Sequence, residues 1–195
     1  MRISVLGNGP SLKNLSLKDI CKSSDVIIGC NRIYLHEEFK FLKNEILVAF
    51  TDLSFRSIRD EVNKKVLKKN SLFAADIELN NEGKSFEIIR GTNFKGDSDF
   101  AVSNIKKFPK LFEMSSVIST LVMPYAFSLR PKYINIYGVD MKYYINGKFQ
   151  PYFYNKDINK SYNWDVNQAK KWSDQFSKEI KSQTNYIFRK GIKIK

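Results

Sequence analysis

The chain has 195 residues, 43% of them hydrophobic and 27% charged, which suits one folded domain of ordinary size and excludes large-scale disorder. Its net charge of +13 suits an anionic partner, such as a nucleic acid, a phosphorylated or acidic sugar, or an anionic membrane surface, and the alternative is a lysine-rich surface in contact with solvent only. The two cysteines and the single histidine lack metal-ligand spacing, which argues against a zinc site and against a disulfide framework.

Apolar runs alternate with helical patterns through the first half of the chain. Strands are predicted at Ile3–Leu6, Asp25–Gly29, Ile46–Phe50 and Ser71–Ala75. Between them, helices are predicted at Leu17–Cys21 and at 53–69, where buried positions recur every four residues.

The second half continues this alternation with less regular spacing. Its predicted strands are Ser85–Arg90, Tyr133–Tyr137 and Tyr186–Arg189, and its predicted helices are Met114–Leu129 and Trp164–Gln183. Polar residues 91–99 predict a loop, and Asn146-Gly147 between aromatic residues predicts a hairpin turn. In the tail, 189–195, lysines alternate with isoleucines, which favours a last strand over a weak contact with a membrane surface.

Buried strands that alternate with helices predict an α/β fold, in which helices cover both faces of a mostly parallel sheet. No repeat or linker divides the chain, so we expect a single domain over 1–195, with a small lid-like segment near 142–163. The longest apolar stretch, 117–129, is too short to span a bilayer, and no signal peptide precedes the first strand. We therefore expect a cytoplasmic protein, with a peripheral contact with the inner membrane left open.

Polar residues follow several of the predicted strands. Ligands of parallel sheets bind beyond the carboxyl ends of the strands. We therefore expect one edge of the sheet to carry the binding site, with the residues Asn8, Asn31, Asp52 and Asp140.

The loop after the first strand, Gly7-Asn8-Gly9-Pro10-Ser11, is typical of a turn whose main-chain amides bind a phosphate at a helix N-terminus. Its spacing differs from the G-x-G-x-x-G of dinucleotide sites. The alternative is a turn that needs Gly and Pro for its own geometry, with Ser11 or Asn14 as a helix cap.

Four short blocks along the chain, in this order, resemble bacterial sialyltransferases that modify lipo-oligosaccharide, and related glycosyltransferase-like proteins. The blocks are Gly7-Asn8-Gly9-Pro10-Ser11-Leu12-Lys13, Cys30-Asn31-Arg32-Ile33-Tyr34, Ser115-Ser116-Val117 and Tyr137-Gly138-Val139-Asp140. The resemblance extends over most of the chain, 2–147, and its first block is the most specific. It implies a single Rossmann-like domain that transfers a sugar from a CMP-activated donor to a glycan acceptor, with neither a metal nor a further cofactor.

The resemblance also implies roles for single residues. Asn8 and Gly9 would approach the phosphate or ribose of the donor, and Asn31 would contact its nucleotide. Tyrosines after the fourth block would steady the leaving phosphate, and their hydroxyls suit that role. The residues expected to bind the donor are Gly7, Asn8, Gly9, Ser11, Asn31, Asp52, Ser115, Ser116 and Tyr144.

Glycosyl transfer further needs a base for the acceptor hydroxyl. The sialyltransferases place a histidine near the start of their C-terminal helix, where this chain has Tyr162-Asn163-Trp164-Asp165. The catalytic candidates are therefore Asp165, Asp140 and Tyr154. Asp165 followed three residues later by Gln168 is also the pattern of a helix capping box, and His36 is expected to be a surface residue.

Other functions stay open at this point. Asp97 and Asp99 have a spacing that binds a divalent metal in many nucleotide-sugar enzymes. A nucleotide- or glycan-binding module without the base is the non-enzymatic alternative. Nucleic-acid binding ranks last, because the basic residues are spread along the chain without a recognisable motif. The expected partners are thus a nucleotide-sugar donor and a glycan acceptor, with an oligomer left open.

Overall fold

The computed structural model describes residues 1–42, 46–49, 73–80, 83–89, 98–102, 116–146, 148–150, 152–154 and 165–195. Within these ranges an eight-stranded sheet runs in the order β10-β7-β1-β2-β3-β4-β5-β6. Its strands are β1 (Arg2–Leu6), β2 (Val26–Cys30), β3 (Leu47–Ala49), β4 (Phe73–Asn80), β5 (Gly83–Ile89), β6 (Ser98–Val102), β7 (Tyr133–Tyr137) and β10 (Lys193–Ile194).

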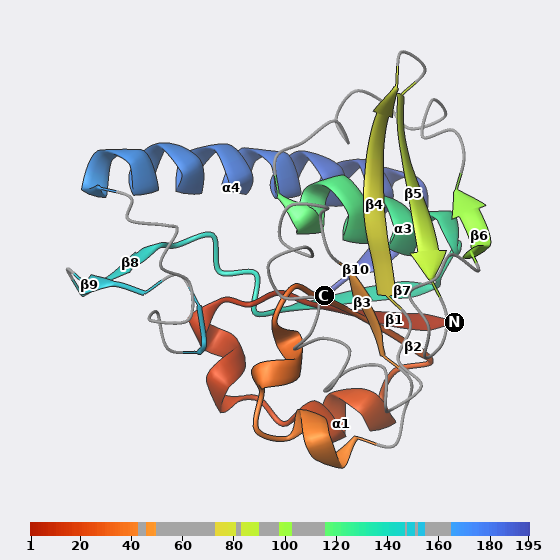
Figure 1. The fold of residues 1–195 in the computed structure, drawn as a ribbon, viewed down its shortest axis with the longest axis horizontal. Coiled ribbons are helices and arrows are strands. Elements are labelled where there is room, and N and C mark those ends of the chain that lie inside the picture. Colours follow the sequence, from red (N-terminus) through yellow and green to blue (C-terminus); the bar gives the residue numbers. More distant parts are fainter. Residues whose placement is uncertain are drawn as a thin grey trace.

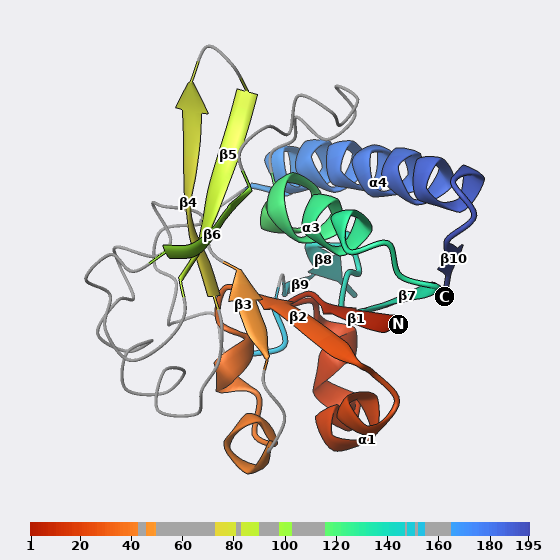
Figure 2. The same ribbon diagram turned by 90° about the vertical axis from the view of Figure 1, so that its right-hand side faces the viewer.

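The sheet is parallel from β10 to β4, and β5 and β6 extend it with antiparallel pairing (Figures 1 and 2). In the central strand β1, Ile3 pairs with Val26 on one side and with Ile134 on the other. Ile3 and Val5 are fully buried, as expected for a strand covered on both faces. The prediction of a mostly parallel sheet in an α/β fold is thereby confirmed.

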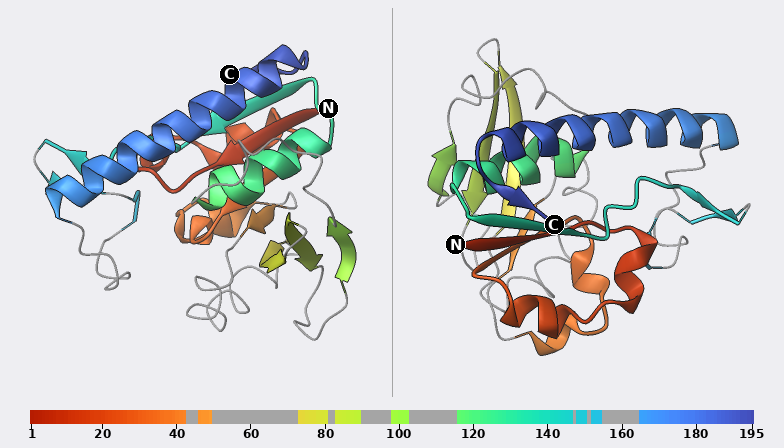
Figure 3. Two further views of the ribbon diagram at one scale, coloured as in Figure 1. Left: turned by 90° about the horizontal axis from the view of Figure 1, so that it is seen from above. Right: turned by 180° about the vertical axis from the view of Figure 1, so that it is seen from behind.

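Helices lie on both faces of the sheet (Figure 1). On one face lie η1 (Pro10–Asn14), α1 (Leu17–Lys22), η2 (Ile33–Leu35) and η3 (Phe39–Phe41); on the other lie η7 (Ile118–Val122), α3 (Met123–Ser128) and α4 (Val166–Arg189). Each face of the sheet has its own hydrophobic core. Leu12 and Leu17 belong to the core on the side of α1, and Met123 and Ile187 belong to the core on the side of α4. Figure 3 shows α4 running alongside β7, with its first turn near the hairpin β8–β9.

The end of α4 corrects one prediction. Tyr186–Arg189 is the last turn of this helix and not a strand. Ile187 is fully buried four residues after the buried Gln183, so the helical spacing of the inner face continues to the end. Gly191, with φ +86°, follows the helix, and the tail then forms β10 beside β7, as its alternating pattern predicts.

Other elements agree with the sequence to different degrees. The predicted hairpin forms between β8 (Tyr144–Ile145) and β9 (Lys148–Phe149), with Asn146 at φ 50° in its turn. The predicted loop 91–99 is wrong at its end, because β6 already begins at Ser98. From residue 116 on, the predicted helix Met114–Leu129 is a π-helical turn that continues directly into α3. Pro124, in the first turn of α3, has no N–H to donate to the preceding turn, and Gln183 Nε2 donates to the Ser119 carbonyl there at 2.7 Å. The predicted helix 53–69 lies outside the described residues.

Candidate functional site

The topology places two loops side by side at the carboxyl edge of the sheet. The chain moves outward from β1 to β6 and then returns to the other side of β1 with β7, so the strand order reverses between β1 and β7. Ligands of open α/β sheets bind at such a reversal. The loops that follow these two strands, 7–9 and 138–140, carry the first and last blocks of the predicted site.

The two loops are bonded to each other. Gly7 N–H donates to the carbonyl oxygen of Tyr137 at 2.8 Å, and Gly9 N–H donates to that of Gly138 at 2.7 Å. A Cβ on Gly7 would collide with the carbonyl oxygen of Gly138 and would lie 2.8 Å from a methyl group of Val139. Packing between two backbones therefore explains both glycines of the loop.

Asp140 completes this contact. Its Oδ2 accepts the main-chain N–H of Ser11 at 2.8 Å, and the same oxygen would collide with a Cβ on Gly9. Leu12 N–H donates to the carbonyl oxygen of Gly9 at 3.1 Å. Four amides of the loop that the sequence predicts as a phosphate cradle thus already have acceptors within the protein, and Asp140 acts on the loop as a positioning residue.

The helix after this loop also differs from the expected one. It is the five-residue η1, whose N-cap Gly9 has no capping side chain. Ser16, and neither Ser11 nor Asn14, caps the following helix α1 by accepting the N–H of Asp19 at 3.3 Å. The alternative interpretation of the loop, a turn that needs Gly and Pro, is the one that these contacts support.

Asn8 and Asn31 form the polar centre of the edge. Asn8 is 7% exposed, and its Nδ2 donates to the carbonyl oxygen of Cys30 at 3.0 Å, beside Asn31. Asn31 has φ 46°, a conformation that asparagine tolerates better than most residues, and its N–H donates to Ala49 in β3. The Oδ1 atoms of Asn8 and Asn31 are both buried without a hydrogen-bond partner in the part of the chain that the structure describes.

Arg32 and Tyr154 lie against this pair. Arg32 is 9% exposed, and it follows Asn31 at the end of β2. Burial raises the pKa of the Tyr154 hydroxyl, the neighbouring Tyr152 raises it further, and Arg32 acts in the opposite direction. Burial also raises the pKa of the Cys30 thiol to about 12, so this thiol is neutral at physiological pH. The edge therefore combines two amide oxygens, a buried guanidinium and a neutral phenol.

The segment 152–154 covers this edge. Phe153 N–H donates to the main-chain oxygen of Asn8 at 2.8 Å, and the rings of Tyr152 and Tyr154 stack with centroids 4.9 Å apart. Part of the segment predicted as lid-like therefore lies on the carboxyl end of β1. Tyr144, the residue of this segment that is predicted to bind the donor, has its ring 5.4 Å from that of Phe149 across the hairpin.

His36 is buried, contrary to the prediction of a surface residue, with 5% of its surface exposed. Its Nε2 lies 3.3 Å from the carbonyl oxygen of Leu12, its Nδ1 accepts the N–H of Glu38 at 3.3 Å, and its ring lies 5.6 Å from that of Phe153. Both ring nitrogens therefore bond main-chain groups, and His36 joins three segments beneath the site. The charged neighbours in its sequence, Glu37 and Glu38, give no sign of this burial.

Asp165 caps α4. Its Oδ1 accepts the N–H of Gln168 at 2.8 Å, and Gln168 Oε1 accepts the N–H of Asp165 at 3.4 Å, which confirms the predicted capping box. Ser116 likewise accepts the N–H of Ser119 at the start of the helix that ends in α3. Asp52, Ser115 and Asp97 lie outside the described residues, and Asp99 belongs to strand β6.

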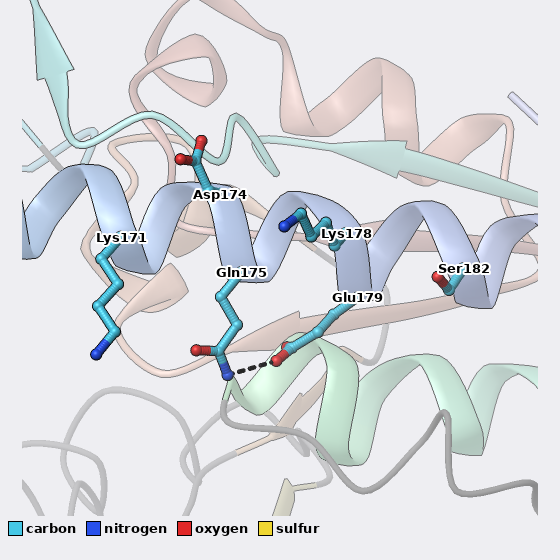
Figure 4. A pocket seen from close by; sticks show the side chains of 6 residues that line it. All are labelled: Lys171, Asp174, Gln175, Lys178, Glu179 and Ser182. Carbon is cyan, nitrogen blue, oxygen red and sulfur yellow. Dashed lines mark hydrogen bonds between the residues drawn. The ribbon is translucent and has the colours of Figure 1, made fainter.

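A groove of about 630 Å³ lies along α4, away from these residues (Figure 4). It is lined by Lys171, Asp174, Gln175, Lys178, Glu179 and Ser182. The carboxylate of Glu179 accepts from Gln175 at 2.9 Å and from the Ser119 hydroxyl at 3.1 Å, so it ties α4 to η7. The groove contains none of the predicted site residues.

Comparison with protein families, curated proteins and solved structures finds no match for this chain. Within the described residues, no group of three or more His, Cys, Asp or Glu side chains could hold a metal ion. The candidate site thus consists of Asn8, Asn31 and Arg32. Asn8 and Asn31 are predicted because they lie just after strands, and Arg32 lies one residue after Asn31, so the same rule would have found it.

Proposed function

We propose that this chain is a Rossmann-like domain that binds a CMP-activated sugar at the carboxyl ends of β1 and β2 and transfers the sugar to a glycan acceptor. The proposal joins the resemblance to bacterial sialyltransferases with the geometry of this edge. The single observation that carries it is the pair of buried Oδ1 atoms of Asn8 and Asn31, which accept no hydrogen bond from the described residues.

A buried acceptor without a donor costs about 1–3 kcal/mol. A ligand that supplies donors at both oxygens would recover this free energy on binding. The ribose hydroxyls and the amino group of cytosine are donors, whereas phosphate oxygens are acceptors. Asn8 and Asn31 therefore suit the nucleoside of the donor. The guanidinium of Arg32 and the hydroxyl of Tyr154 suit its phosphate, because they can oppose the charge that develops on the leaving group.

Calorimetric titration with CMP, CDP, UDP and GDP tests this proposal. We expect CMP to bind best, and Asn31→Ala to weaken CMP by about tenfold, since one hydrogen bond of about 1.4 kcal/mol is lost. Asn14→Ala, at an exposed position of η1, is the matched control and should bind CMP like the natural chain. Equal affinity for all four nucleotides would refute the assignment.

A second candidate function is a binding module without transfer activity. It is favoured because the residues that could act as the base already hold hydrogen bonds. Asp165, Asp140 and His36 each already bond main-chain groups. Asp165→Asn separates the two functions, because asparagine caps a helix as well as aspartate but cannot act as a base. If Asp165 only caps α4, Asp165→Asn keeps stability and any transfer activity, whereas Asp165→Ala loses about 1 kcal/mol of unfolding free energy. Loss of transfer with unchanged stability in Asp165→Asn would instead identify Asp165 as the base.

A further inference from the structure

The edge of the sheet formed by β10 and β7 carries a group of lysines around one tyrosine ring. The Nζ atoms of Lys132, Lys193 and Lys195 lie 5.5, 5.6 and 5.3 Å from the centre of the Tyr133 ring. All three lysines are exposed, and Tyr133 is half-buried. We name these four residues the Tyr133 cluster.

The register of the two strands explains this arrangement. Lys193 pairs with Tyr133 and Ile194 with Ile134, so β10 and β7 present the same alternation. Ile134 and Ile194 pack into the core beneath α3 and α4. Tyr133 and Lys193 therefore project from the opposite face of the sheet, on the side of α1, and the alternation continues to Lys195 just after β10. There the three ammonium groups lie around the tyrosine ring, within reach of cation–π attraction.

The end of α4 adds exposed apolar and basic side chains near this edge. Phe188 is 65% exposed, which is high for a phenylalanine, and it stands directly before the exposed Arg189 and Lys190. The Nζ atom of Lys190 lies 5.5 Å from the centre of the Tyr186 ring. The helix end joins β10 through three residues, 190–192, and Figure 2 shows the end of α4 directly beside this edge strand.

No Asp or Glu side chain forms an ion pair with these lysines in the described part of the chain. Its two ion pairs, Arg2–Asp25 and Lys22–Asp19, involve none of the lysines of the cluster. Segments 130–133 and 186–195 contain no Asp or Glu at all. Three ammonium groups around one ring repel one another, and an anionic surface that approaches them would relieve that repulsion.

We propose that this edge of the sheet, with the Tyr133 cluster on its α1 face and Phe188 at the end of α4 on the other face, forms a docking surface for an anionic lipid bilayer. Lysines attract the acidic headgroups, and an exposed phenylalanine can insert at the interface together with the amphipathic tyrosines. A nucleic acid would use the same charges but would gain from the exposed ring of Phe188 only where a base stacks on it. The described helices include none that is long and apolar enough to cross a membrane.

This inference does not depend on the proposed function. The cluster lies at the first residue of β7, whereas Asn8 and Asn31 lie beyond the last residues of β1 and β2. Docking through the cluster would therefore leave the carboxyl edge of the sheet uncovered (Figure 1).

Co-sedimentation with vesicles tests the docking surface. We expect the natural chain to bind vesicles that contain phosphatidylglycerol and not vesicles of phosphatidylcholine alone. The triple variant Lys132→Gln, Lys193→Gln, Lys195→Gln should bind the acidic vesicles about a hundredfold more weakly, given the usual contribution of each lysine near a membrane surface. Phe188→Ser should weaken binding as well, and the triple lysine-to-arginine variant should bind like the natural chain.

The matched control removes the same charge elsewhere. Lys170, Lys178 and Lys181 are exposed on α4, and their triple change to Gln should weaken binding far less, because charges beyond a Debye length are screened. Equal losses in the two glutamine variants would overturn the proposal in favour of diffuse charge. Failure to bind acidic vesicles would also overturn it, as would displacement from them by single-stranded RNA together with an unchanged affinity of Phe188→Ser. Urea unfolding and circular dichroism establish that each variant folds.

Discussion

At the scale of single residues, the glycines of the first loop show how one sequence pattern supports two explanations. The sequence predicts that Gly7 and Gly9 make room for a phosphate, and the structure shows them making room for the loop after β7. Both explanations require the absence of a side chain. The identity of the neighbouring backbone decides between them, and it comes from a segment about 130 residues away that no local pattern can reveal.

Gly7→Ala tests the backbone contact. The new Cβ would collide with the carbonyl oxygen of Gly138, and this oxygen is fixed by its hydrogen bond to Gly9. We expect the free energy of unfolding to fall by about 3 kcal/mol or more, at the upper end of the usual cost of overpacking. Gly191→Ala is the control: it has the strained φ of +86° but no atom within 4 Å of the added Cβ. It should cost only about 1 kcal/mol, the usual price of a left-handed residue.

Urea unfolding of the two variants gives both values. A Gly7→Ala protein that is as stable as Gly191→Ala would mean that the loops after β1 and β7 can separate at little cost. The amides of the loop would then be available to a ligand after all, as the sequence interpretation requires.

At the scale of elements, the sequence predicts best where burial repeats with one period over several residues. β1, β2, β7 and the β8–β9 hairpin lie close to their predicted positions, and α4 covers most of the helix predicted at Trp164–Gln183, with Ala169 and Phe176 buried on its inner face. The prediction is wrong for Tyr186–Arg189, because a short run of aromatic and β-branched residues suits a strand as well as a helix. Only the packing of Ile187 against the sheet distinguishes them.

Contacts between short helices are equally invisible in the sequence. Glu38, next to η3, reaches the start of α1, where its Oε2 accepts the N–H of Lys18 at 3.1 Å and the hydroxyl of Ser16 at 3.2 Å. The bond from the Lys18 amide is the main reason why the pKa of Glu38 is below its ordinary value of 4.5. The carboxylate thus joins two elements that are separately too short to be stable.

This contact predicts a loss of stability in acid. Since folding lowers the pKa of Glu38, its contribution is complete above pH 4.5 and disappears as the pH falls through the lower pKa of the folded state. Glu38→Gln should therefore be less stable than the natural chain at neutral pH, and the difference should shrink below pH 4.5. Glu37→Gln, which removes the same charge at an exposed neighbour, is the control and should leave this pH dependence unchanged. Urea midpoints measured across that range decide the matter, and parallel curves for the natural chain and Glu38→Gln would contradict it.

At the scale of the whole molecule, the fold class is predictable and the assembly of the site is only partly so. Alternating apolar runs suffice for a parallel sheet with helices on both faces, and the strand-end rule then finds Asn8 and Asn31. The rule gives no information about which of these polar atoms form hydrogen bonds within the protein and which stay available to a ligand. The carboxylate of Asp140 is bound to Ser11, whereas the Oδ1 atoms of both asparagines are left without a described donor. That distinction depends on contacts between loops distant in the sequence.

The net charge of +13 affects the stability of the whole molecule, because like charges repel in the compact state. We expect added sodium chloride to raise the melting temperature, since the Debye length falls from about 30 Å at 0.01 M to about 8 Å at 0.15 M. Chloride is the suitable anion, because sulfate would stabilise the fold by exclusion from its surface. The triple glutamine variant of the Tyr133 cluster should be more stable than the natural chain at low salt and should gain less from added salt. A melting temperature that falls with sodium chloride would show instead that attractive ion pairs dominate the electrostatic free energy of this chain.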